Sequence, residues 1–134
     1  MLLIETEVKN SATQGLGLFA LHWVAKGQKY WVRNEEFDRV FTPQGMNAMN
    51  ELTTGYIKRY GFLEANGNWY LCGDNAKFSN HSKSPNSRSH YDDSGLVKFN
   101  TALTDIQAGE EILCDYTEIC KTCIDGVDFV KSLR

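Results

Sequence analysis

The apolar positions of this chain follow the period of a β-strand in most segments. Near the start, apolar or β-branched residues occupy every second position: Leu2, Ile4, Thr6 and Val8. A period of two places such side chains on one face of a half-buried strand. Further short runs rich in β-branched and aromatic residues lie between clusters of Gly, Asn, Asp, Ser and Pro, at residues 16–21, 29–32, 37–41, 69–72, 96–103 and 111–116. The pattern predicts a mainly β protein.

One central segment has the period of a helix instead. Thr42 suits the N-cap position, Pro43 suits the first turn, and Gly61 suits the end of the segment. Between them, apolar residues recur at helical spacing: Met46, Met49, Leu52, Tyr56 and Ile57. We therefore expect one short helix within residues 42–61.

A polar stretch, residues 75–95, lies between two of the predicted strands and shows little strand character itself. Compact domains rarely use so long a connection unless it carries function, so we expect a functional loop here. Within it, Asp92-Asp93 is followed by Ser94-Gly95, a pattern typical of a turn rather than of two catalytic carboxylates.

The length and composition fit one folded domain. A chain of 134 residues is enough for a single compact domain, and 42% apolar residues can form a core without disulfides or metals. We expect one domain over residues 1–134. The 17 acidic and 14 basic residues give a net charge of −3, which provides no basis for direct nucleic-acid binding and favours a basic partner.

The chain shows no pattern of a membrane segment or a secretory signal. No run approaches the ~18 apolar residues of a membrane span, and Glu5 and Glu7 interrupt the apolar start. The four cysteines are Cys72, Cys114, Cys120 and Cys123. They are few for an exported protein of this length, so we expect reduced thiols and an intracellular location.

A glycine-rich segment near the start allows more than one interpretation. Residues 15–20 fit the Gly-x-Gly-x-x-Ala pattern of dinucleotide-binding proteins. That pattern requires a long helix after the glycines, whereas residues 18–24 are aromatic and β-branched and end at Lys26-Gly27. A plain glycine-rich turn and another kind of ligand site built from the glycine backbone both stay open.

Metal and hydrolytic sites find little support in the motifs. Cys120 and Cys123 have the spacing of half a zinc site, but no second pair of ligands lies nearby in the sequence, so we expect no bound metal. The motifs typical of α/β-hydrolases, P-loop nucleotidases and zinc metalloproteases do not occur in the chain.

Three motifs together resemble a known family. The chain contains Gly15-Leu16-Gly17, then Asn80-His81-Ser82-Lys83-Ser84-Pro85-Asn86, and then Gly109-Glu110-Glu111-Ile112-Leu113-Cys114-Asp115-Tyr116. Their order and spacing are similar to those of the SET-domain protein lysine methyltransferases, over about residues 11–118. Each motif alone is a weak signal, whereas the three together are specific.

This resemblance implies a particular fold. It is a β-clip of several small sheets, in which the C-terminal segment passes under a loop formed by the preceding stretch as a pseudoknot. The crossing places Asn80-His81 beside Tyr116. The helical region within residues 42–61 corresponds to the family's variable insert and is short here. Residues from about 119 to 134 form the C-terminal tail.

The resemblance also implies an activity, the transfer of a methyl group from S-adenosylmethionine to a lysine of a protein substrate. Tyr116 is then the catalytic residue. The implied cofactor-binding residues are Gly15, Leu16, Gly17, Asn80 and His81. Tyr70 and Cys114 are expected to line the channel for the lysine. A histone tail is the first substrate to consider, while the particular lysine and the oligomeric state, a homodimer included, stay open.

Cys114 bears on the number of methyl groups transferred. In the family, the residue two positions before the catalytic tyrosine tends to restrict the product to one methyl group when it is Tyr and to permit two or three when it is Phe. Cysteine has neither ring nor hydroxyl. We therefore expect di- or trimethyl-lysine as product, unless another ring such as that of Tyr70 fills the space.

The chain departs from the family pattern at three points. Many members have Cys directly after Asn-His-Ser and bind zinc with a cysteine-rich tail. Here Lys83 takes that position and the tail has only Cys120 and Cys123, so we expect no zinc-bound cap. Phe129 is a candidate to cover the cofactor instead. Lys77 stands where the family often has Arg.

An alternative function is a SET-like module that has lost catalysis and only binds a protein partner. The intact Asn80, His81 and Tyr116 argue against that alternative. Binding of S-adenosylmethionine distinguishes the two, since a pure protein-binding module is expected not to take it up.

Overall fold

The computed structural model of the protein describes residues 1–119. Its strands are β1 (Thr6–Asn10), β2 (Leu16–Ala20), β3 (Lys29–Val32), β4 (Arg39–Phe41), β5 (Phe62–Leu63), β6 (Trp69–Leu71), β7 (Asn80–His81), β8 (Ser87–Tyr91), β9 (Val97–Ala102) and β10 (Leu113–Cys114). Its helices are α1 (Pro43–Asn47), α2 (Glu51–Tyr60), the 3-10 helix η1 (Asn75–Phe78) and α3 (Tyr116–Ile119). The predicted mainly β fold of several small sheets is confirmed.

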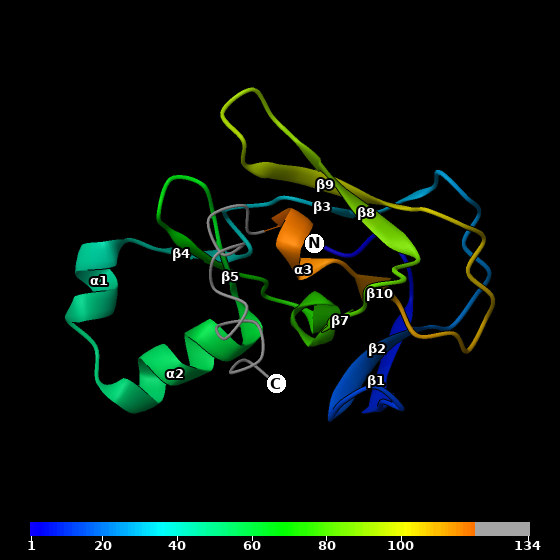
Figure 1. Ribbon diagram of the computed structural model, residues 1–134, viewed down its shortest axis with the longest axis horizontal. Coiled ribbons are helices and arrows are strands. Elements are labelled where there is room, and N and C mark those ends of the chain that lie inside the picture. The colour runs from blue at the N-terminus through cyan, green and yellow to red at the C-terminus, as the bar shows by residue number, and fades with distance from the viewer. Residues whose placement is uncertain (120–134) are drawn as a thin grey trace.

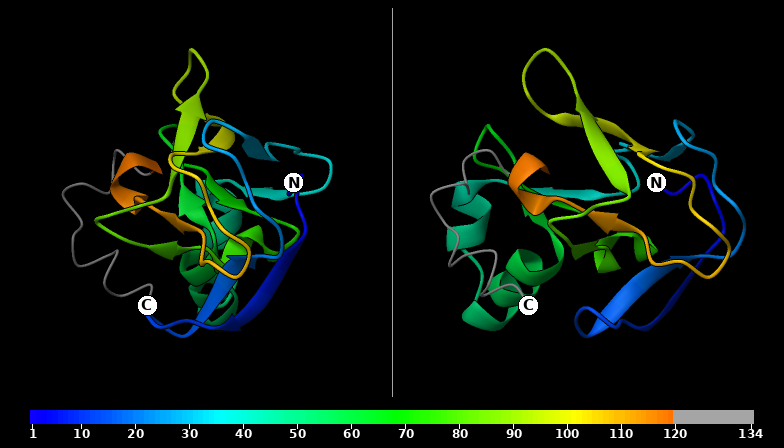
Figure 2. Two further views of the ribbon diagram at one scale, coloured as in Figure 1. Left: turned by 90° about the vertical axis from the view of Figure 1, so that its right-hand side faces the viewer. Right: turned by 45° about the vertical axis from the view of Figure 1, so that its right-hand side comes forward.

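The strands form four small sheets (Figure 1). β1 pairs with β2, the order β3-β9-β8 makes one antiparallel sheet, and β4-β6-β5 makes another. β7 and β10 form a parallel pair, which Figure 1 shows near the middle of the molecule, between the β1–β2 hairpin and helix α2. Figure 2 shows the turn between β8 and β9 projecting away from the rest. None of the helices in this described part is long and apolar enough to cross a lipid bilayer.

β10 lies against residues 80–87 and forms hydrogen bonds with them beyond its pairing with β7. On one side, the amide of Ser82 donates a hydrogen bond to the carbonyl of Cys114 at 2.9 Å. On the other side, the side chain of Asn86 binds the main chain in and before β10. Its Nδ2 donates to the Glu111 carbonyl and its Oδ1 accepts from the Leu113 amide, both at 2.8 Å. These contacts bring the third motif next to the second, while the threading that the family resemblance implies stays a prediction.

Two apolar clusters hold the sheets together. The main cluster consists of Leu18, Ala20, Val24, Tyr30, Trp31, Tyr70, Cys72, Val97, Ala102, Ile106 and Ile112. A smaller cluster joins the helices to β6 and consists of Met46, Ile57 and Trp69. Since two- and three-stranded sheets cannot bury much surface alone, the sheets depend on these shared clusters for stability.

The single helix expected within residues 42–61 is wrong in detail, because the segment forms two helices. Thr42 and Pro43 begin α1 as predicted, but Asn50 begins a second helix by accepting a hydrogen bond from the Thr53 amide at 2.9 Å. The apolar stripe is also only partly buried. Met46 and Ile57 are buried, whereas Leu52 is 86% exposed.

The polar stretch 75–95 contains more regular structure than its composition predicts. It includes η1, β7 and the five-residue strand β8, which pairs with β9 along its length. The reason is that serines fill the inward positions of β8: Ser87 and Ser89 are buried and Arg88 between them is exposed. The alternation is present, but without apolar residues to reveal it.

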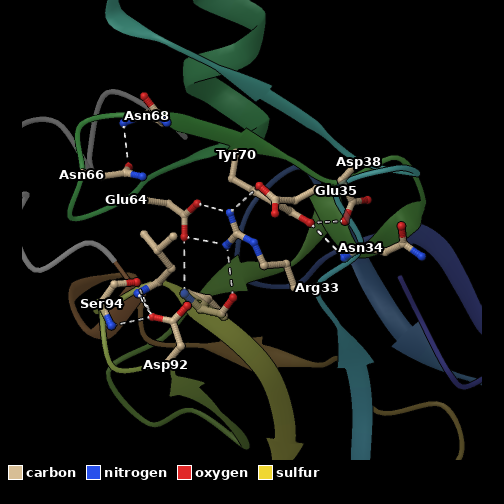
Figure 3. Close-up of polar contacts among 12 residues, drawn as sticks. Arg33, Asn34, Glu35, Asp38, Glu64, Asn66, Asn68, Tyr70, Asp92 and Ser94 are labelled. Carbon is tan, nitrogen blue, oxygen red and sulfur yellow. Dashed lines mark hydrogen bonds and ion pairs between the residues drawn. The ribbon is translucent and has the colours of Figure 1, made fainter.

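A buried ion pair connects the two three-stranded sheets (Figure 3). The guanidinium of Arg33, after β3, donates to both carboxylate oxygens of Glu64, after β5, at 2.7 and 2.8 Å. The Glu64 side chain is 1% exposed and also accepts a hydrogen bond from the amide of Val97 at 3.3 Å. Although burial lowers the pKa of Arg33, the hydrogen bonds and charge of Glu64 outweigh it and raise that pKa above its usual value.

Candidate active site

Tyr116 begins helix α3 and is fixed at two of its atoms. Its backbone amide donates a hydrogen bond to Nδ1 of His81 at 3.0 Å. Its hydroxyl donates to the carbonyl of Ser79, which directly precedes β7. The parallel pairing of β7 and β10 thus brings together two motifs that are 35 residues apart in the sequence, as the resemblance implies.

The hydrogen bond from Tyr116 also fixes the protonation of the His81 ring. Because Nδ1 accepts the amide hydrogen, we assign the ring proton to Nε2. Oδ1 of Asp115 lies 3.7 Å from the same Nδ1, too far for a hydrogen bond and facing a nitrogen that carries no proton. His81 therefore supports the backbone of Tyr116 as a neutral acceptor. The centroids of the two rings lie 5.6 Å apart.

Asn80 connects β7 to the glycine-rich turn between β1 and β2. Its side chain is buried, at 2% exposure. Nδ2 lies 3.1 Å from the carbonyl of Gln14, 2.9 Å from the carbonyl of Leu16 and 2.8 Å from Oε2 of Glu111. With only two hydrogens on this nitrogen, the amide is fully used by these three acceptors.

The glycine-rich turn offers open backbone at one glycine and close packing at the other. Gly15 has a φ of +53°, and a Cβ there would meet nothing within 4 Å. Leu16 is 47% exposed. Gly17 is different, since a Cβ there would lie 2.4 Å from Oε2 of Glu111. Gly15 and Leu16 face open space, whereas Gly17 faces a side chain of the same protein.

Glu111 is the residue of this site whose role the sequence does not reveal. It lies within the third motif, but the motif alone gives no reason to single it out from Glu110 beside it. In the structure, both of its carboxylate oxygens lie within 2.9 Å of the Ser11 hydroxyl, and one accepts from Asn80. Only the three-dimensional contacts of the side chain distinguish the two glutamates.

The two predicted channel residues lie in different surroundings. Cys114 in β10 is 6% exposed, and its thiol lies 3.6 Å from the carbonyl of Asn80, so it is next to the motif residues. Tyr70 in β6 is 0% exposed and belongs to the main core. Its hydroxyl donates to the buried carboxylate of Asp38 and accepts from the Asn34 amide at 3.2 Å.

The packing of Tyr70 explains its chemistry. Its ring stacks on Phe62 with centroids 5.2 Å apart, and the Arg33 guanidinium lies 4.3 Å from its centre on a face (Figure 3 shows Tyr70 near Arg33 and Asp38). Burial raises the pKa of its hydroxyl, and the hydrogen bond to Asp38 adds to the effect. Tyr70 is a neutral, fully packed side chain, and its role in a lysine channel stays a prediction.

Cys72 is a buried thiol of the core. Burial raises its pKa, and the nearby Asp38 carboxylate contributes in the same direction, so Cys72 stays protonated. Within residues 1–119, no group of three or more His, Cys, Asp or Glu side chains is placed to hold a metal ion. Cys120, Cys123 and Phe129 lie outside the described residues.

Comparisons with known proteins agree with this arrangement. The chain matches the family model of the SET domain over residues 15–117. Among solved structures it is similar to the crystal structure of a Plasmodium falciparum protein named a "putative histone methyltransferase", with 21% sequence identity and a TM-score of 0.58. The similarity covers 84% of this chain and 93% of that chain, and it concerns the fold. No match is found among the curated protein sequences.

Proposed function

Because the chain belongs to the SET-domain family, whose members are generally protein lysine methyltransferases, we propose that it methylates a lysine side chain of a protein substrate with S-adenosylmethionine as methyl donor. The observation that carries the proposal is the placement of Tyr116. Its hydroxyl is directed by the Ser79 carbonyl and its backbone by His81, next to the glycine-rich turn that Asn80 holds.

The residues present fit the methyl donor. At Gly15 a left-handed φ and the open space at the Cβ position leave backbone that a ligand can approach closely. Leu16 and the main chain of His81 are the neighbouring groups that would hold the cofactor. When bound, S-adenosylmethionine supplies an electrophilic methyl group next to a positive sulfur. The carbonyl of Ser79 provides a negative partial charge at this site, which suits a cationic centre.

The active site must also favour the neutral form of the substrate's lysine amine. A free lysine has a pKa of ~10.4 and is almost entirely protonated at neutral pH, so it is a poor nucleophile. Burial of the amine in a narrow channel lowers its pKa because the charged form loses its hydration. The buried surroundings of Cys114, at 6% exposure, are suited to this effect.

Tyr116 then orients the amine rather than taking its proton. Since its hydroxyl hydrogen is donated to Ser79, the oxygen faces a substrate amine as a hydrogen-bond acceptor. An acceptor at this point aligns the N–H bonds and therefore directs the nitrogen lone pair. Positioning of a reacting pair can contribute several kcal/mol to catalysis.

The finer specificity follows from Cys114 and from charge. Cys114 leaves space where a tyrosine would place a ring and a hydroxyl, which favours di- or trimethyl-lysine. A net charge of −3 favours a basic protein segment such as a histone tail. The similar Plasmodium protein is named for histone methylation, which supports the same first choice of substrate.

A methyl-transfer screen tests the proposal. Purified protein is incubated with radiolabelled S-adenosylmethionine and either core histones or a whole-cell lysate, with the Tyr116→Phe variant as control. We expect labelled protein bands with the wild type and none with the variant. Calorimetric titration with S-adenosylmethionine is run in parallel. If the wild type takes up no cofactor and labels nothing, it is instead a SET-like protein-binding module.

A further inference from the structure

Three segments meet at the carboxylate of Glu111. The Ser11 hydroxyl, just after β1, lies 2.7 and 2.9 Å from its two oxygens, and Nδ2 of Asn80 donates to one of them at 2.8 Å. The same Asn80 nitrogen donates to the Leu16 carbonyl in the turn. Glu111 therefore lies at the centre of a hydrogen-bond group that includes both ends of the glycine-rich turn.

The backbone of Glu111 is itself rigidly placed. It forms a β-bridge with Phe19 of β2, and its carbonyl accepts a hydrogen bond from Nδ2 of Asn86 at 2.8 Å. A side chain that extends from so fixed a backbone can set the position of the groups that bind it. The turn, in contrast, has residues 12–16 all exposed to solvent, so few packing contacts hold it.

Gly17 gives a second, independent observation. Its φ is not in the left-handed region, so its backbone conformation does not require glycine. A Cβ on it would nevertheless lie 2.4 Å from Oε2 and 2.9 Å from Cδ of Glu111. It would also lie 3.1 Å from Cβ of Ser11, but the two shorter contacts are with Glu111, so the Glu111 carboxylate is the main reason for glycine at this position. Gly15 requires glycine for another reason, namely its φ of +53°.

We propose that Glu111 is a positioning residue, which holds the glycine-rich turn, residues 11–17, in the conformation that binds S-adenosylmethionine, and that Gly17 lacks a side chain to admit its carboxylate. Asn80 takes part through the same group, since its side-chain amide is used by the turn and by Glu111. The statement about the turn stands on contacts within the protein, whereas the statement about the cofactor rests on the proposed function.

The test of the turn uses the cofactor-free protein. Hydrogen exchange of the amides of residues 14–17 is measured for the wild type, Glu111→Ala, Gly17→Ala and the double variant. We expect each single variant to exchange roughly tenfold faster or more, and the double variant no faster than Glu111→Ala. Additive acceleration in the double variant, or unchanged exchange in Glu111→Ala, would overturn the proposal.

The test of cofactor binding uses the same variants in calorimetric titration with S-adenosylmethionine. We expect Kd to rise about tenfold or more in both single variants, and by no more in the double variant, because both changes remove the same carboxylate contact. If Gly17 instead contacts the cofactor directly, the losses in the double variant multiply, and the proposal fails. A wild type that binds no cofactor refutes the proposed function while leaving the exchange result valid.

Two matched variants make the result specific. Glu110→Ala changes the neighbouring glutamate, whose side chain accepts from the Gln107 amide at 3.2 Å on the exposed surface. We expect wild-type exchange and affinity for it. Glu111→Gln keeps the size of the side chain but places an NH2 group against a donor, so we expect an intermediate change. This variant keeps the test decisive if Glu111→Ala does not fold.

Discussion

Tyr116 shows how much of the predicted chemistry depends on single atoms. Its hydroxyl donates to Ser79 and its backbone amide to His81, so the residue is held at its main chain and at the end of its side chain. A tyrosine held in this way has a defined oxygen position, which a catalytic group needs and an ordinary core tyrosine does not.

Tyr116→Phe removes only the hydroxyl. We expect kcat for methyl transfer to fall on the order of 100-fold, since an orienting group at the reacting nitrogen is lost. The free energy of unfolding should fall by only about 1 kcal/mol, for one hydrogen bond to a carbonyl. Initial rates and urea unfolding measure the two quantities. Tyr56→Phe, at an exposed position of α2, is the control, and equal activity of the two variants would remove Tyr116 from its proposed role.

Cys114 determines the second prediction at this scale. Because its thiol lies 3.6 Å from the Asn80 carbonyl in a buried position, a larger side chain there enters the space beside the motif residues. We expect the wild type to convert a substrate peptide beyond monomethyl-lysine and Cys114→Tyr to stop mainly at monomethyl-lysine. Mass spectrometry of the peptide at full turnover measures the distribution, with Cys72→Ser as a core-cysteine control. Strict monomethylation by the wild type would contradict the prediction.

At the scale of elements, the two-residue strand β10 owes its position to side chains as much as to strand pairing. It has only two residue pairs with β7. The Asn86 side chain adds a donor to Glu111 and an acceptor to Leu113, both at 2.8 Å, and so replaces the ladder that a longer strand would have. Since Glu111 and Tyr116 flank β10, this side chain supports the whole site.

Asn86→Ala should therefore destabilise the protein and disturb the site together. Two backbone groups, the Glu111 carbonyl before β10 and the Leu113 amide in it, lose their partners at about 1–3 kcal/mol each when buried, so we expect a loss of about 2–4 kcal/mol in the free energy of unfolding. Urea unfolding measures it, and the affinity for S-adenosylmethionine should fall as well. Asn47→Ala on exposed α1 is the control. A loss below about 0.5 kcal/mol would show that the remaining contacts of β10, with β7, Ser82 and Ser87, are enough to hold the strand.

Elements were predictable from the sequence wherever apolar residues mark the buried face. The run at residues 29–32 has the same bounds as β3, and residues 69–72 nearly those of β6. Strand β8 was not predicted because Ser87 and Ser89, which are polar, fill its inward positions. The break between α1 and α2 was not predicted because Asn50 can lie within a helix or cap one. Its extended backbone conformation in the structure makes it the N-cap of α2.

The residues of the site, too, were predictable only in part. Its motif residues, Asn80, His81 and Tyr116, could be named because their order and spacing are specific, and the structure brings His81 and Tyr116 into contact. Glu111 and the buried state of Tyr70 could not be predicted, because both depend on partners far away in the sequence. Tyr70 lies against Asp38, 32 residues away, and Glu111 against Ser11, 100 residues away.

At the scale of the whole molecule, charge placed in the interior joins sheets that share little backbone pairing. The Arg33–Glu64 pair connects the β3-β9-β8 sheet to the β4-β6-β5 sheet (Figure 3). Glu64, after β5, accepts from two residues of the other sheet, since it also binds the amide of Val97 in β9. A buried pair is well compensated while complete, and costly when one partner is lost.

Arg33 allows a buried and an exposed ion pair to be compared within one protein, because it also approaches the exposed Glu35. Its Nη2 lies 2.7 Å from Glu64, which is 1% exposed, and 3.5 Å from Glu35, which is 63% exposed. Glu64→Gln should lower the free energy of unfolding by about 3 kcal/mol, since it leaves the guanidinium without its buried counter-charge. Glu35→Gln makes the same chemical change in solvent and should cost within about 0.5 kcal/mol.

Urea unfolding of both variants, and of each in an Arg33→Met background, measures the difference. Without the guanidinium the Glu64 carboxylate is the buried charge that lacks a partner, so Glu64→Gln, which removes that charge, should then cost nothing or stabilise the protein. The loss caused by Glu35→Gln should be equally small in either background. If Glu64→Gln costs the same with and without Arg33, the boundary between the sheets is held by packing around Tyr70 and Val97, and the ion pair contributes nothing to it.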